Sequence, residues 1–130
     1  MTKKEVIQIL AILKAAYPNS YKYNSDMEAA GTVNIWFSEF APFPADIILL
    51  AVQKHISNSS FPPSIYEVKR KIQSLHWEAY EIINNALPET ASYKKAKRIY
   101  DLTREYRMSV PEKPLFEIIN GENEERLLLE

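Results

Sequence analysis

The stretch SIYEVKRKIQSLHWEAYEIINNAL at residues 64–87 decides the fold of this chain. Its apolar residues recur at alternating steps of three and four, which places them on one side of an α-helix. They are Ile65, Val68, Ile72, Leu75, Ala79, Ile82 and Ala86. Ser64 and Glu67 have the spacing of a capping box at the start, and Pro88 stops the helix. The pattern predicts one long helix from Ser64 to Leu87.

The second half of this helix carries another apolar stripe and therefore needs a second partner surface. The stripe consists of Trp77, Tyr80, Ile83 and Leu87. A fifth helix is predicted over Ser92–Met108. The short link Pro88–Ala91 favours an antiparallel hairpin of these two helices.

Three shorter helices are predicted before this hairpin, over Lys3–Ala16, over Asp26–Phe40 and from Pro44 onward. The first two begin with capping-box spacings, and the apolar positions of each fall on one face, Trp36 and Phe37 among them. The third is apolar nearly all round, which is typical of a central, buried helix. No segment has a convincing strand pattern. The predicted fold is therefore an all-α bundle of three short N-terminal helices, with a long fourth helix in a hairpin with a fifth.

The charge is unevenly distributed along the 130 residues, although the net charge is only −1. Residues 1–75 carry +2, residues 76–108 carry +1 and residues 109–130 carry −4. We predict an N-terminal helical core domain at 1–75, a helical hairpin extension at 76–108 and an acidic, flexible tail at 109–130. The absence of cysteine excludes disulfides and thiolate metal sites.

The sequence lacks the patterns of common catalytic and cofactor sites. Gly31 and Gly121 are its two glycines, so a P-loop and a dinucleotide-binding fingerprint are excluded. His55 and His76 have no acidic ligand cluster beside them, so a zinc site is not expected. No apolar run reaches the roughly 20 residues of a membrane span. We expect a protein without enzymatic activity, cofactor or membrane contact, located in the cytoplasm.

Two basic clusters could form a contact surface. One is Lys69, Arg70 and Lys71; the other includes Lys94, Lys97 and Arg98, next to Tyr93 and Tyr100. Mixed basic and aromatic residues suit stacking and phosphate contact, so the second cluster is the better candidate for nucleic acid. A protein-facing surface and a plain solvated helix face remain alternatives for both.

Two further sets of side chains are candidates for binding a protein partner. Trp77 and Tyr80 are either core residues of the hairpin or interface anchors, because Trp and Tyr dominate interface hot spots. The tail holds apolar residues in acidic sequence, which suits a docking motif, a strap across the hairpin or a dispensable end. These residues are Phe116, Ile118, Ile119, Leu127, Leu128 and Leu129.

An ordered set of segments between Thr2 and Lys71 resembles the loader/inhibitor family of phage and prophage replicative helicases. The segments are KKEVIQILAILKAAYPNSY at 3–21, TVNIWFSEFAPFPADIILLAVQKHI at 32–56 and SSFPPSIYEVK at 59–69. The resemblance covers slightly more than half of the chain and does not extend past about Leu75.

This resemblance implies a small non-enzymatic adaptor in phage DNA replication. Such a protein binds a hexameric, DnaB-like replicative helicase in a bacterial host, restrains it, and helps to load it at an origin-bound replisome organiser. The family has a folded N-terminal helical domain and a flexible C-terminal part implicated in helicase binding. Helices four and five depart from this pattern, since they predict more C-terminal order.

Two other functions are compatible with the residues alone. One is a small helical DNA-binding or transcriptional regulator that uses both basic clusters, although the near-neutral charge disfavours it. The other is a structural oligomer that uses the apolar seam of residues 65–86 as a dimer interface.

Overall fold

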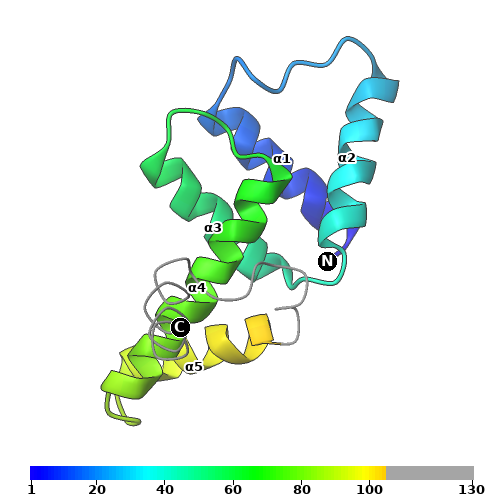
Figure 1. Cartoon of the computed structure of the whole chain (residues 1–130). Helices are drawn as coiled ribbons and strands as arrows, with labels where there is room; N and C mark the ends of the chain where they lie inside the picture. The colour runs from blue at the N-terminus through cyan, green and yellow to red at the C-terminus, as the bar shows by residue number, and fades with distance from the viewer. Residues whose placement is uncertain (105–130) are drawn as a thin grey trace, which may run out of the picture. The chain divides into compact units, whose positions relative to one another are not determined.

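The computed structural model describes residues 1–104 of the chain and confirms the all-α fold class (Figure 1). This part contains five helices and no strand. The helices are α1 (Lys3–Ala16), α2 (Asp26–Phe40), α3 (Ala45–Asn58), α4 (Ile65–Asn85) and α5 (Ala91–Arg104).

The helices begin and end close to the predicted positions. Pro44 is the N-cap residue of α3, and α4 stops at Asn85, two residues before the predicted end at Leu87. The chain turns there because the backbone N–H and the hydroxyl of Thr90 both donate to the carbonyl of Leu87, at 3.0 and 2.7 Å. The predicted end of the fifth helix at Met108 lies outside the described residues.

Reciprocal capping boxes start α1 and α4. At α4, Ser64 N–H donates to Glu67 Oε1 and Glu67 N–H donates to Ser64 Oγ, both at 3.1 Å. At α1, Thr2 and Glu5 make the same two bonds, at 2.8 and 3.2 Å. Backbone N–H groups in the first turn of a helix have no acceptor within the helix, and each box supplies acceptors for two of them. Thr2 and Ser64 therefore fix where α1 and α4 begin.

The contacts within the chain divide it into two compact units, Met1–Ile72 and Gln73–Glu130, with the boundary inside α4. The first unit contains α1, α2, α3 and the start of α4. The second contains the rest of α4 and α5 in its described part. The predicted three-part division at residues 75 and 108 stays a prediction.

The core of the first unit forms where α1 contacts α2 and α3 (Figure 1). All five predicted apolar residues of α1 are buried, as are four apolar residues of α3. These are Val6, Ile9, Leu10 and Leu13 of α1 with its C-cap residue Tyr17, and Ile47, Ile48, Ala51 and Val52 of α3. The expectation of a buried central helix is thus confirmed for this face of α3, while Leu49 and Leu50 are half-buried.

Aromatic side chains fill the corner between α2 and α3. The ring centroids of Trp36 and Phe40 lie 5.3 Å apart, and those of Phe40 and Phe43 lie 6.0 Å apart. All three side chains are buried. Phe37, predicted to be a core residue, is only half-buried, and the Lys3 ammonium lies 5.6 Å from its ring centroid. Its ring therefore lies at the edge of the core, beside a cation that contacts solvent.

The predicted apolar stripe of α4 is buried over only part of its length. Val68, Ile72, Leu75 and Ala79 are 0–3% exposed, whereas Ile82 is 41% exposed. Leu87, from the second stripe, is 64% exposed. Beyond Ala79 the stripes are therefore partly exposed in this chain, because helical periodicity gives the direction of a side chain and not the surface that covers it.

No single helix in residues 1–104 is long and apolar enough to span a membrane, and α2 and α3 meet the criteria only as a pair bent by 111°.

The capping boxes make stability sensitive to acid. Hydrogen bonds from the backbone of Thr2 and of Ser64 lower the pKa values of Glu5 and Glu67 below their ordinary values. A carboxyl whose pKa is depressed on folding stabilises the protein above its unfolded pKa, and this contribution is lost as the pH falls through the folded pKa. We expect the melting temperature to fall between about pH 5 and pH 3, and the double variant Glu5→Gln/Glu67→Gln to weaken this dependence.

A matched control for this prediction is Glu81→Gln/Glu89→Gln, which removes two exposed carboxylates outside the capping boxes. Melting temperatures of the three proteins are measured by circular dichroism across this pH range. Equal acid sensitivity in the capping-box variant and the native chain would contradict the assignment.

Candidate partner-binding surfaces

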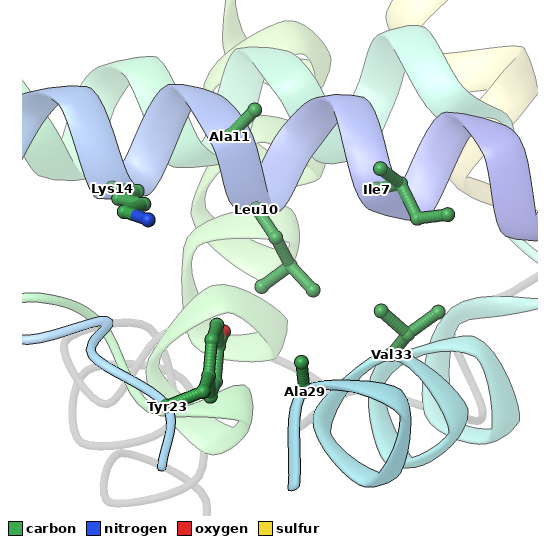
Figure 2. Close-up of a pocket in the computed structure, with 7 residues that line it drawn as sticks. All are labelled: Ile7, Leu10, Ala11, Lys14, Tyr23, Ala29 and Val33. Carbon is green, nitrogen blue, oxygen red and sulfur yellow. The ribbon is translucent and has the colours of Figure 1, made fainter. Parts of the chain in front are cut away.

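An open apolar groove lies between α1 and α2 in the first unit (Figure 2). It has a volume of about 230 Å³. The lining residues are Ile7, Leu10, Ala11 and Lys14 of α1, Ala29 and Val33 of α2, and Tyr23 of the preceding loop. Lys14 is the one charged side chain among them. Apart from Lys14 and Tyr23 the lining is aliphatic, so its chemistry fits an apolar side chain of another molecule.

The groove exists because α1 has more apolar surface than the core covers. Ile7 and Ala11 lie one turn apart on a side of α1 next to the buried face, and Ile7 remains 53% exposed. Sequence analysis did not identify this groove. The available signal was the pair Ile7 and Ala11, four residues apart and outside the predicted buried face of α1.

Two polar side chains attach the loop before α4 to the core of the first unit. The buried His55 ring places Nε2 2.8 Å from the carbonyl oxygen of Phe61. A carbonyl only accepts, so Nε2 carries the proton and donates it. The Tyr17 hydroxyl donates to the carbonyl of Ser59, at 2.8 Å. His55 thus has a structural partner, and its role is to hold the loop that leads to Ser64.

Four rings gather between α4 and α5 in the second unit, and we call them the hairpin aromatic cluster: His76, Trp77, Tyr80 and Tyr100. The His76 and Tyr100 rings are stacked, with centroids 4.7 Å apart and planes inclined by 20°. Trp77 meets the rings of His76 and Tyr80 edge to face, at 4.9 and 5.6 Å. Tyr80 and Tyr100 are 6.2 Å apart.

A buried hydrogen bond joins α4 and α5 beneath this cluster. His76 Nδ1 lies 2.7 Å from Thr103 Oγ1, and the Thr103 hydroxyl donates to the carbonyl of Ile99, at 2.8 Å. The hydroxyl has one proton, so its oxygen accepts from the Nδ1–H of His76. Both side chains are buried. The bond therefore fixes the tautomer of His76 and the pairing of the two helices.

The structure brings together the two predicted anchors of the hairpin. Trp77 is half-buried and Tyr80 is 40% exposed, so Tyr80 is the more accessible of the pair. Their role as binding residues stays a prediction. The tail residues predicted to bind a partner lie outside the described part of the chain. They are Phe116, Ile118, Ile119, Leu127, Leu128 and Leu129.

The predicted basic residues differ in their surroundings. Lys69 is ion-paired with Glu39 at 2.6 Å, and Arg70 and Lys71 are half-buried. Lys94, Lys97 and Arg98 are exposed on α5. Lys97 pairs with Asp101 at 3.2 Å. The two clusters belong to different units, and the more exposed one is on α5.

The described residues contain no group of three or more His, Asp or Glu side chains that could hold a metal ion. Together with the groove and the exposed aromatic side chains, the arrangement defines a small all-helical protein with apolar surfaces suited to binding other macromolecules.

Comparison with known families agrees with this class. The family model for the N-terminal domain of the helicase loader/inhibitor of phage SPP1 matches residues 1–69, more than half of the chain. The chain therefore belongs to this phage helicase loader/inhibitor family. The match covers the first unit nearly completely and ends in the first part of α4. No curated protein and no solved structure gave a match.

The hydrogen bond between His76 and Thr103 can be tested by mutation. The variant Thr103→Val keeps the shape of the side chain but removes the acceptor for the buried Nδ1–H. We expect the free energy of unfolding to fall by about 1–3 kcal/mol, as when other buried polar groups lose a hydrogen-bond partner. Chemical denaturation followed by circular dichroism measures this change.

The control is Thr32→Val on α2. The Thr32 hydroxyl also donates to a carbonyl of its own helix, that of Glu28 at 3.3 Å, but this bond is exposed. We expect a change within about 0.5 kcal/mol. Equal effects of the two substitutions would contradict a specific role for the buried bond.

Proposed function

We propose that this protein is a non-enzymatic adaptor in phage DNA replication, acting in the cytoplasm of a bacterial host. It binds a hexameric replicative helicase, restrains its activity and helps to load it at an origin-bound replisome organiser. The observation that carries this proposal is the family match over residues 1–69. The exposed apolar and aromatic side chains of both units support a binding function.

The hairpin aromatic cluster supplies the helicase-binding surface in this proposal. Tyr80 presents a large, partly exposed ring, and Trp77 packs against its edge. Rings held by neighbouring rings lose little conformational entropy on binding, which is one reason that Trp and Tyr are frequent hot spots. The predicted tail motif, which includes Phe116 and Leu127, adds a second contact to the same partner.

Inhibition and loading follow from binding one conformation of the helicase better than another. An adaptor that favours a closed, inactive state of the ring shifts the population toward it by its difference in affinity. Release at the origin then requires that the organiser weaken this preference. Such a mechanism needs two binding surfaces and no catalytic residue.

The α1–α2 groove supplies the second surface in this proposal. It lies in the unit that the family shares, and Ile7 exposes apolar area beside a hollow large enough for one apolar side chain. Lys14 provides a single positive charge at the lining. We therefore assign the groove, which lies in the folded N-terminal unit, to the organiser.

The helicase surface is tested by replacing Tyr80. The variant Tyr80→Ala is expected to weaken capture of the replicative helicase in the presence of an ATP analogue by about 30-fold, which is the effect of a hot-spot side chain worth roughly 2 kcal/mol. Tyr66→Ala is the matched control, since Tyr66 is a 64% exposed tyrosine of the same helix but lies in the first unit. A chain ending at Ser109 tests the contribution of the tail.

Different results would refute the proposed function and the proposed binding surface. The adaptor function would be refuted if the native chain neither bound the helicase nor changed the ATPase rate of the helicase. Capture that depends on Tyr66 and not on Tyr80 would refute the assigned surface alone.

The groove is tested by placing a charge beside it. Ile7→Glu is expected to weaken binding to the replisome organiser about tenfold, because a carboxylate beside an apolar hollow disfavours burial there. Ile35→Glu is the control: Ile35 is 59% exposed on α2 and does not line the groove. Helicase capture should be unchanged in both variants. Equal loss of organiser binding in both would contradict a role for the groove.

A duplex-DNA regulator using both basic clusters has less support. The Lys69 ammonium is bound to Glu39, and Arg70 and Lys71 are half-buried. The first cluster is therefore a poor source of phosphate contacts.

A further inference from the structure

Helix α5 is strongly basic in a chain that is nearly neutral overall. Between Ala91 and Arg104 it carries five cations and a single carboxylate, that of Asp101, which gives +4 against −1 for the whole chain. The cations are Lys94, Lys95, Lys97, Arg98 and Arg104, and all five are exposed. Such a concentration of like charge on one short helix is unfavourable unless a counter-charge approaches it.

Aromatic and basic residues alternate along one edge of this helix. Tyr93, Lys97, Tyr100 and Arg104 follow one another at steps of four, three and four, so their side chains share one side of α5. We call this row the aromatic-basic edge. The Lys97 ammonium lies 5.8 Å from the Tyr100 ring centroid. Both tyrosines are half-buried, so part of each side chain remains accessible.

The rigidity of this edge comes from the hairpin aromatic cluster. Tyr100 stacks on His76 with one face and touches Tyr80. One helical turn beyond it, Thr103 accepts the buried bond from His76. The aromatic-basic edge therefore has a fixed register, with about 10 Å of helix between Tyr93 and Tyr100 and a cation between them.

We propose that the aromatic-basic edge of α5 binds single-stranded nucleic acid. Lys97 and Arg104 of this edge, together with the adjoining Lys94, would contact phosphates, and unpaired bases would stack on Tyr93 and Tyr100. Proteins that hold single strands combine a positive track for the backbone with aromatic rings for the bases. An acidic protein segment would satisfy the charge but would make no use of the accessible parts of the Tyr93 and Tyr100 rings. A duplex presents no free base faces to them.

This activity goes beyond the proposed helicase adaptor and can be measured without a helicase. The first experiment is fluorescence anisotropy of a labelled oligothymidylate of about 20 nucleotides, titrated with the full chain at about 50 mM salt. With three phosphate contacts, the affinity should fall about 20-fold between 50 and 200 mM salt. No binding at the lower salt would overturn the proposal, as would equal affinity for a duplex of the same length.

The charge component is tested with Lys94→Gln/Lys97→Gln. Loss of two phosphate contacts should weaken binding roughly 25-fold at about 0.1 M salt and reduce the slope against salt. The control Lys4→Gln/Lys22→Gln removes two exposed charges of the first unit and should leave binding unchanged. Equal losses in the two double variants would show that only overall charge matters and would overturn the assigned site.

The stacking component is tested at Tyr93. Tyr93→Phe keeps the ring and should bind as the native chain does, whereas Tyr93→Leu should lose at least about fivefold. An unchanged affinity of Tyr93→Leu would overturn the stacking role. Helicase capture by the Lys94/Lys97 variant provides the link to the proposed function. Retained capture with lost binding of the oligonucleotide would show that the two activities are separate.

Discussion

The burial of α3 is the constraint on which the first unit depends. Four of its apolar side chains, Ile47, Ile48, Ala51 and Val52, are at most 1% exposed. Helix α1 packs against α3 and covers them. The rings of Trp36, Phe40 and Phe43 fill the core where α2 leads into α3. This apolar burial outweighs the entropy lost by ordering the chain, and it fixes which side of α1 faces inward. The adjoining side of α1, with Ile7 and Ala11, is then left to line the groove.

Hydrogen bonds from two core side chains hold the loop that leads to α4. Tyr17 and His55 hold the carbonyls of Ser59 and Phe61, and the capping box of Ser64 and Glu67 then starts α4. These residues belong to the segments that resemble the loader/inhibitor family. The loop in turn sets where a long helix begins.

The two units divide the proposed activities. The first unit is the part matched by the family and carries the groove. The second carries the hairpin aromatic cluster and the basic helix α5, beyond the matched residues. The buried bond between His76 and Thr103 joins the two helices that carry both surfaces.

The sequence by itself determined the helices, because capping residues, prolines and apolar periodicity act over a few positions. The start of α4 after Ser64 and the buried face of α1 needed no other information. Tertiary structure decided which apolar residues are covered: Ile82 continues the helical pattern of the buried residues of α4, yet it is 41% exposed. It also decided the pairing of His76 with Thr103, 27 positions apart. Such contacts depend on the distance between helices, which periodicity does not encode.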